Sequence, residues 1–186
     1  MREITTVLFD FGGVLVNLNK QRCIDEFKKI GVYQVENYIS NYTQSGLFLA
    51  LEKGLISDEE FRNEIRKLSD KTLSDQQIDT AWNSFLLDIP EYKLDLLLQL
   101  RKKYRVTMLS NTNSIHFGQK ARHEFGKKGL SIDDYFDKCY LSYQLGMAKP
   151  QEDIFNHVLE NEPAKAHEIL FLDDGVLNIE TAKRLG

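Results

Sequence analysis

The chain has 186 residues, the size of one domain or of one domain that carries a sizeable insertion. Its 24 Lys and Arg and 28 Asp and Glu give a net charge of −4, which argues against a nucleic-acid binder. A hydrophobic content of 42% excludes a disordered or fibrous chain, and no apolar run approaches the roughly 18 residues that cross a membrane. Two cysteines are too few for a disulfide framework, and the N-terminus does not resemble a signal peptide. We therefore expect a soluble, cytoplasmic protein with no nucleic-acid or membrane partner, while nothing in the sequence indicates its oligomeric state.

The chain opens with a strand that is followed by a glycine turn. Residues 4–9 are mostly apolar and β-branched, which predicts a buried strand that ends at Asp10. Gly12 and Gly13 then predict a turn, before a second short apolar run over residues 14–16. The pattern places a carboxylate at the carboxyl end of the first strand.

A helical block follows the first strand. From about Asn19 the apolar residues recur at helical spacing, and Gly31 is placed as a helix stop. Two further helix starts have the capping-box pattern, at residues 57–60 (SDEE) and 74–77 (SDQQ). No strand is predicted within this block, which extends to about residue 88. We therefore interpret the block as an insertion into one α/β domain.

The remainder of the chain alternates helices with strands. Further strands are predicted at residues 106–109, 139–141 and 169–172. Pro150 is predicted as the first residue of a helix that runs to about Leu159. The alternation is typical of a parallel, Rossmann-like α/β sheet, with its site beyond the carboxyl ends of the strands. We expect residues 1–18 and 89–186 to form this core and residues 19–88 to form an all-helical cap.

Polar residues stand where the predicted strands end. In chain order they supply a carboxylate, hydroxyl and amide donors, a cation and a pair of carboxylates: Asp10, Ser110, Asn111, Lys149, Asp173 and Asp174. Taken singly, most of them also fit a structural role as a turn residue, a helix cap or a solvated lysine. The adjacent carboxylates at 173 and 174 do not, because they repel each other unless a cation or a proton compensates.

Four segments together resemble the motifs of the haloacid dehalogenase superfamily, in particular its phosphatases with a helical cap. They are residues 7–14 (VLFDFGGV), 108–112 (MLSNT), 146–150 (GMAKP) and 171–174 (FLDD), the last with Asn178. The motifs occur in the family's order and span nearly the whole chain. Within the superfamily, Gly12 and residues 54–57 resemble the branch that contains sugar-1-phosphate phosphatases.

The resemblance implies a nucleophile and a metal site. Asp10 would attack phosphorus and form an aspartyl phosphate. Mg²⁺ would be bound by Asp10, the Gly12 carbonyl and Asp174, with Asp173 either a ligand or a partner of one. Three carboxylates, Lys149 and Mg²⁺ sum to a neutral site before the phosphate enters, whereas without the metal a dianionic phosphate would be repelled.

The resemblance also implies a phosphate-binding set and a substrate class. Ser110 and Asn111 would donate to phosphoryl oxygens, and Lys149 would stabilise charge in the transition state. The expected function is Mg²⁺-dependent hydrolysis of a small phosphorylated metabolite, a sugar phosphate. A dehalogenase of the same family uses no metal, and the carboxylate pair argues against that activity.

The sequence departs from the family pattern at two places. Where these phosphatases carry a second Asp as general acid and base, this chain has Gly12, which has no side chain to transfer a proton. The departure favours substrates with a good leaving group, such as a sugar 1-phosphate over a 6-phosphate, and it leaves open a pseudo-enzyme that binds a phosphorylated ligand or a protein. The chain also stops at Gly186, where the family continues, so we expect either a fragment or an exposed sheet edge.

The histidines and the one tryptophan have structural interpretations. The four histidines, His116 among them, show no ligand spacing and are expected on surfaces or helices, although His116 lies close enough to the second motif to approach a substrate. Trp82 is expected to belong to the core of the cap.

Overall fold

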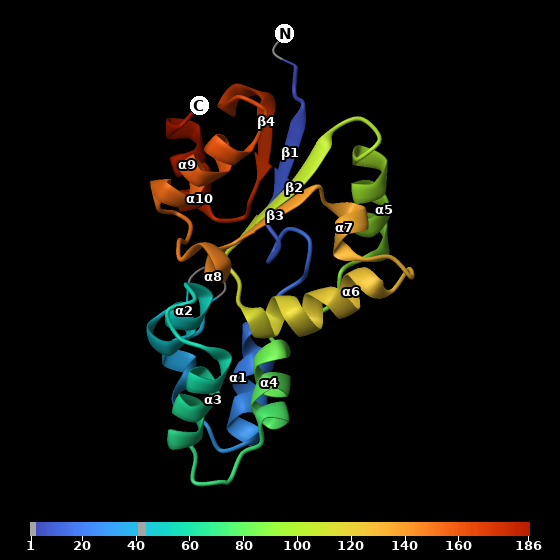
Figure 1. Ribbon diagram of the computed structural model, residues 1–186. Coiled ribbons are helices and arrows are strands. Elements are labelled where there is room, and N and C mark those ends of the chain that lie inside the picture. The colour runs from blue at the N-terminus through green and yellow to red at the C-terminus, as the bar shows by residue number, and fades with distance from the viewer. Residues whose placement is uncertain (1–2, 41–43) are drawn as a thin grey trace.

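The computed structural model describes residues 3–40 and 44–186, and its centre is a parallel sheet (Figure 1). The strands are β1 (Thr6–Phe9), β2 (Arg105–Ser110), β3 (Lys138–Leu141) and β4 (Ile169–Leu172). They lie in the order β3-β2-β1-β4, and every neighbouring pair is parallel. This confirms the predicted α/β class and the approximate position of each predicted strand.

Helices cover both faces of the sheet, as a parallel sheet requires. Along β1 the side chains alternate, so that Val7 and Phe9 pack in one hydrophobic cluster while Leu8 packs in another. Figure 1 shows α9 and α10 on one side of the sheet and α5 with α7 on the other. The helices that accompany the sheet are α5 (Glu91–Leu100), α6 (Arg122–Gly126), α7 (Ile132–Tyr135), α8 (Ser142–Leu145), α9 (Glu152–Asn161) and α10 (Val176–Arg184). Short helical turns complete this part at η2 (His116–Ala121) and η3 (Ala166–Glu168).

Between β1 and α5, the regular elements that the structure describes are helices and one helical turn, joined by loops and two isolated bridges. They are α1 (Lys20–Lys29), the turn η1 (Gln34–Asn37), α2 (Gly46–Glu52), α3 (Asp58–Lys67) and α4 (Asp75–Asn83). Figure 1 shows these helices gathered at the end of the molecule toward which the strands run. Both predicted capping boxes are present, because the side chains of Ser57 and Ser74 accept from the amides of Glu60 and Gln77. We call α1–α4 the helical group.

The helical group shares one hydrophobic core with the sheet. Trp82 is fully buried and packs on Phe48, with the ring centroids 4.8 Å apart. The same cluster of buried residues continues through Phe11, at the end of β1, to Phe125 in α6. Trp82 thus lies in the core of the helical group, as predicted, and the helical group rests on the sheet domain through apolar contacts.

One predicted helix start is wrong. Helix α9 begins at Glu152, and Pro150 lies before it in a turn, with a cis peptide bond to Lys149. Proline is compatible with a helix start and with a turn alike, so the local pattern could not separate the two.

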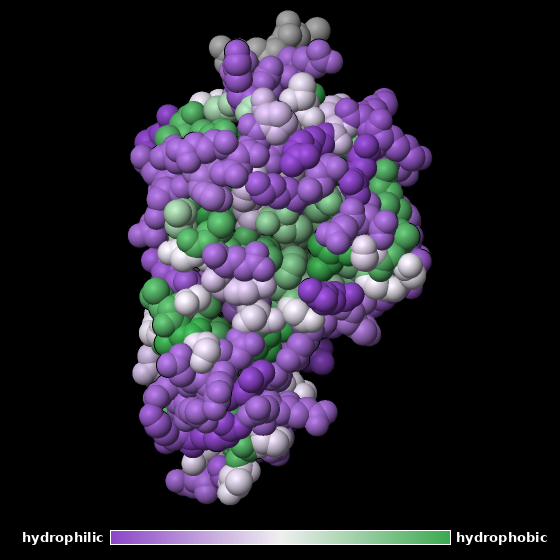
Figure 2. Space-filling view, viewed as in Figure 1, coloured by the Kyte–Doolittle hydropathy of each residue, from purple (hydrophilic) through white to green (hydrophobic). Residues whose placement is uncertain are grey.

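The outer surface is mostly polar. Figure 2 shows hydrophilic residues over most of the visible face, with hydrophobic residues between them in patches. Strand β4 is at the edge of the sheet, where Leu170 and Leu172 are 45% and 37% exposed. Across residues 3–40 and 44–186, the structure contains no helix with the length and apolar character that crossing a membrane takes.

Candidate active site

The parallel register brings the polar strand ends to one edge of the sheet. Phe9, the last residue of β1, is paired with Met108 of β2 and with Leu172 of β4. The residues that follow, Asp10 and Asp173, therefore emerge side by side. The amide of Asp10 still donates to the carbonyl of Leu172 at 2.8 Å, which fixes the main chain of the first carboxylate.

Lys149 joins the carboxylates of two strands. Its Nζ lies 2.9 Å from Oδ1 of Asp10 and 2.5 Å from Oδ2 of Asp173, and its side chain is almost fully buried. Burial alone would lower the pKa of Lys149, but the charges of Asp10 and Asp173 outweigh it and hold the pKa above the usual range. The site therefore contains a permanent cation beside Asp10.

Asp10 is buried but remains an anion at neutral pH. Burial raises its pKa to about 6, the charge of Lys149 opposes this rise, and the charge of Asp173 adds to it. Oδ1 of Asp10 accepts from the amide of Phe11 at 2.6 Å as well as from Lys149. Within the described parts of the chain, no donor bonds to Oδ2, which leaves that oxygen available for a ligand.

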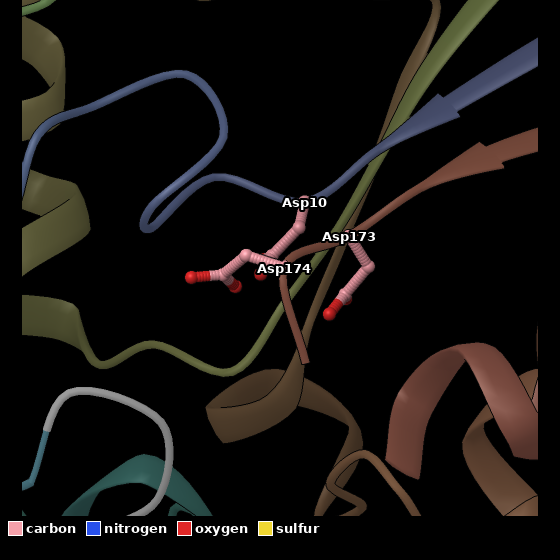
Figure 3. A group of neighbouring side chains, drawn as sticks. All are labelled: Asp10, Asp173 and Asp174. Atoms are coloured by element: carbon pink, nitrogen blue, oxygen red, sulfur yellow. The ribbon is translucent and has the colours of Figure 1, made fainter. Parts of the chain in front are cut away.

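The two neighbouring aspartates have different environments. Asp173 uses both oxygens within the protein, because Oδ2 accepts from Lys149 while Oδ1 accepts from the amide of Gly175 at 2.7 Å and from Asn178 at 2.8 Å. Asp174 is exposed, and burial together with the charge of Asp173 raises its pKa. In Figure 3 the side chains of Asp10 and Asp174 extend to the same side, and that of Asp173 extends to the other.

The carboxylates fit a hard divalent cation. One oxygen each from Asp10, Asp173 and Asp174 lies within 4.8 Å of the others, and oxygen atoms are the ligands that Mg²⁺ prefers. Both oxygens of Asp173 already accept from protein donors, so the oxygens most open to a metal belong to Asp10 and Asp174. Gly12 lines the same pocket, and its carbonyl accepts no hydrogen bond from any residue that the structure describes.

Gly13 permits the close approach of Asp174. Its φ is +75°, and a Cβ atom at this position would lie 2.1 Å from Oδ2 of Asp174. Any other residue would displace the carboxylate from the pocket.

Ser110 is the last residue of β2 and Asn111 follows it, but their side chains have different contacts. Ser110 is buried and lines the pocket beside Asp10. The carboxamide of Asn111 is occupied, because it donates to the carbonyl of Lys149 and accepts from its amide, each at 2.9 Å. The sequence predicted this side chain as a phosphate donor, whereas in the structure it holds the main chain of Lys149.

Two further residues line the pocket, Glu52, which sequence reasoning missed, and His116, which it did not assign to the site. Glu52, at the end of α2, is 7% exposed and lines the pocket with Asp10 and Lys149. Its burial and the charge of Asp10 raise its pKa to about 8, against the opposing charge of Lys149. His116 lies in η2, in agreement with the expected helix, but it is buried and lines the pocket, and its ring stacks on Trp82 with the centroids 4.2 Å apart.

Comparison with known proteins agrees with this geometry. Residues 4–186 match the family model of haloacid dehalogenase-like hydrolases. The chain belongs to this family of hydrolases. It is 38% identical to a D-ribitol-5-phosphate phosphatase of Bacteroides thetaiotaomicron, over 98% of this chain and 89% of that protein.

Solved structures of the family have the same fold. A HAD family enzyme from Bacteroides thetaiotaomicron, in complex with magnesium and inorganic phosphate, superposes with a TM-score of 0.92 at 49% identity, over 98% of this chain and 91% of that one. A HAD-like hydrolase from Porphyromonas gingivalis superposes with a TM-score of 0.90 at 42% identity, over 98% and 88% of the two chains.

Proposed function

We propose that this hydrolase is a Mg²⁺-dependent phosphatase that cleaves a small phosphorylated sugar or sugar alcohol through an aspartyl phosphate on Asp10. The observation that carries the proposal is the position of Lys149, which lies between Asp10 and Asp173 at the pocket into which Asp174 also projects. The buried ammonium of Lys149 can bind a phosphoryl group. The free oxygen of Asp10, one of the two carboxylates that hold this ammonium, can attack it.

The proposed mechanism gives each residue one task. Oδ2 of Asp10 attacks phosphorus, while Lys149 and the hydroxyl of Ser110 bind the phosphoryl oxygens and offset their charge. Asp173 orients Lys149 through its side chain, and Asn111 orients it through its main chain. Because these partners are in place before the substrate arrives, the site is preorganised for the transition state.

A divalent metal completes the charge of the site. Asp10 and Asp174 would hold Mg²⁺, together with the Gly12 carbonyl, and the ion would neutralise phosphoryl charge. The magnesium and phosphate in the related Bacteroides structure support this assignment.

The substrate is proposed from the relative and from the pocket. The relative's name specifies a phosphate on a primary alcohol of a sugar alcohol, which differs from the anomeric 1-phosphate that Gly12 favours. The preference for a 1-phosphate stays a prediction, and D-ribitol 5-phosphate and its chemical neighbours are the first substrates to test.

We also propose that the chain divides into a core of residues 1–18 and 89–186 and a cap of residues 19–88. The bridge between Leu18 and Leu86 closes the base of the cap, and Glu52 and Leu86 extend from it into the pocket. The cap would then recognise the leaving group. The two cysteines are free thiols, which fits the cytoplasmic location that we propose.

A substrate panel tests the function. Phosphate release would be measured from D-ribitol 5-phosphate, D-glucose 6-phosphate and D-glucose 1-phosphate, with Mg²⁺ and with a chelator. We expect turnover of at least one ester, lost in chelator. Binding of the esters without any phosphate release would support the pseudo-enzyme alternative, and full activity in chelator would exclude the metal.

A further inference from the structure

The pocket lacks the family's usual proton donor, and this raises the question of which group protonates the departing oxygen. Gly12 occupies the place of the acid and has no side chain. A primary alkoxide leaves slowly unless a proton is supplied, and general acid catalysis is typically worth 10² to 10⁴ in rate. A donor must therefore come from another part of the pocket if the substrate is a primary phosphate ester.

His116 is excluded by its hydrogen bonds. Nε2 lies 3.0 Å from the carbonyl of Trp82, and Nδ1 lies 3.3 Å from the side-chain amide of Asn113, whose oxygen accepts from the amide of His116. Both ring nitrogens are thus engaged within the core. Burial lowers the pKa of His116 to about 4, so the ring is neutral at neutral pH, and its one N–H proton is donated to the carbonyl of Trp82.

Lys149 and Asp174 are also unsuitable as the proton donor to the leaving oxygen. The protons of Lys149 are shared between Asp10 and Asp173, which hold it as a cation. Asp174 faces the proposed metal, where an ionised carboxylate is needed. Among the lining residues that the structure describes, this leaves Glu52 as the acid.

Glu52 is held rigidly against the loop that carries Ser110. Ser142 places its hydroxyl 2.5 Å from the Glu52 carbonyl and 2.9 Å from the amide of Thr112, two residues after Ser110. Gly54, two residues after Glu52, has a φ of +64° and packs against the main chain of Tyr143. A Cβ atom at Gly54 would lie 2.2 Å from the carbonyl oxygen of Tyr143. The end of α2 therefore has a fixed position relative to the phosphate-binding loop.

The side chain of Glu52 has no protein partner among residues 3–40 and 44–186. No described donor bonds to its carboxyl oxygens, although the residue is buried. Because Glu52 lines the pocket, its carboxyl group is open to a hydrogen bond from a ligand. The charged groups that face it across the pocket are Asp10, Lys149 and Asp174.

We propose that Glu52, extending from the cap, is the general acid and base of this phosphatase. The inference rests on the proposed function. In the first step the bond from phosphorus to Asp10 forms, the bond from phosphorus to the leaving oxygen breaks, and the proton of the Glu52 carboxyl passes to that oxygen. In the second step the Glu52 carboxylate takes a proton from water, whose oxygen attacks phosphorus and releases Asp10 and phosphate. The ester and water become the alcohol and phosphate, and Glu52 regains its proton.

The test compares two leaving groups in a Glu52→Gln variant. With enzyme in excess over substrate and Mg²⁺ present, release of the leaving group reports the first step alone. One substrate is p-nitrophenyl phosphate, whose leaving anion needs no proton. The other is D-ribitol 5-phosphate or, if it is cleaved faster, D-glucose 6-phosphate. The matched control is Glu59→Gln, because Glu59 is an exposed glutamate of the same helical group.

We expect Glu52→Gln to slow release of the primary alcohol by about 10²-fold or more and release of p-nitrophenol by less than about threefold. Glu59→Gln should leave both rates unchanged. Equal slowing of both substrates, no slowing of either, or a change only in the enzyme concentration that gives the half-maximal rate would overturn the role of Glu52 while the phosphatase function stands. If the wild-type enzyme releases neither leaving group, the proposed function itself is contradicted.

Discussion

At the scale of single residues, Lys149 is the point where the site is assembled. Its ammonium contacts the carboxylates that follow β1 and β4, and its main chain is held by the residue that follows β2, Asn111. One residue thus couples the ends of three strands. A displacement of Lys149 would therefore displace the nucleophile, Asp10, and the phosphate-binding loop that follows β2.

Gly13→Ala tests the approach of Asp174. The new methyl group would overlap Oδ2 of Asp174, so the carboxylate must move away from Asp10. We expect the Mg²⁺ concentration for half-maximal activity to rise by at least about tenfold, a loss of about 1.4 kcal/mol. The control is Gly126→Ala, since nothing lies within 4 Å of a Cβ at that position. An unchanged Mg²⁺ dependence in Gly13→Ala would show that Asp174 does not bind the metal.

Gly12→Asp tests whether a missing acid can be restored. A Cβ at Gly12 meets Leu18 at 3.4 Å, an ordinary contact, so the position has room for a side chain. Added to Glu52→Gln, it should raise release of a primary alcohol by at least about tenfold over Glu52→Gln alone. The rate of p-nitrophenol release should not rise in parallel. A parallel rise of both rates would show a general change in the site rather than proton transfer.

Most of the residues that the structure brings together in the pocket could be predicted from the sequence, because each stands at the end of a strand that the local pattern indicates. Ser110 ends β2, Asp10 directly follows β1, and the pair at 173 and 174 directly follows β4. The ends of parallel strands meet at one edge of the sheet. The role of Asn111 could not be predicted, because its partner is the main chain of a residue far along the sequence. Glu52 was missed for the same reason, because only the packing of the helical group against the sheet brings it to the pocket. Its place as a lone glutamate at the end of an apolar helix was the available signal.

At the scale of elements, the starts of two helices of the helical group are determined by short-range contacts. Helices α3 and α4 begin at capping boxes that could be recognised within four residues of sequence. The start of helix α9 and the π-helical form of η2 could not be predicted in this way. The position of Pro150 and the π-helical form of η2 depend on tertiary packing, which the local pattern does not contain.

Ser74→Ala measures the contribution of one cap. Loss of the hydroxyl leaves the amide of Gln77 without its acceptor at the start of α4. We expect the free energy of unfolding, measured in urea, to fall by about 1 kcal/mol with the catalytic rate unchanged. Thr72→Ala, an exposed position just before the helix, is the control and should change the stability by less than about 0.5 kcal/mol. Equal effects of the two substitutions would contradict the capping role.

At the scale of the whole molecule, the buried carboxylate of Glu124 links α6 to the segment that precedes α5. Glu124 in α6 accepts from the amide of Ile89, from Lys127 and from Lys120. Burial alone would raise its pKa, but these hydrogen bonds outweigh burial and lower the pKa to about 2. The contact joins α6 to the segment where the chain returns from the helical group to the sheet domain.

The depressed pKa predicts a specific loss of stability in acid. The stabilisation from Glu124 is complete above the pKa of about 4.5 in the unfolded chain and is lost as the pH falls toward 2. Glu124→Gln should therefore be less stable than wild type at pH 6 and should lose less stability between pH 6 and pH 3. The control is Glu160→Gln, because Glu160 is exposed on α9. Parallel curves for wild type and Glu124→Gln would contradict this account of Glu124.

The central claim, that Asp10 is the nucleophile of a Mg²⁺-dependent phosphatase, is tested most directly by trapping the covalent intermediate. The enzyme would be mixed with p-nitrophenyl phosphate and Mg²⁺, quenched in acid during turnover and digested for mass spectrometry. We predict one added phosphoryl group on the peptide that contains Asp10, absent in chelator and absent in Asp10→Asn, which should also lose essentially all turnover. Contradiction would come from a phosphoryl group on another residue, or from an Asp10→Asn variant that keeps more than about a tenth of the wild-type rate.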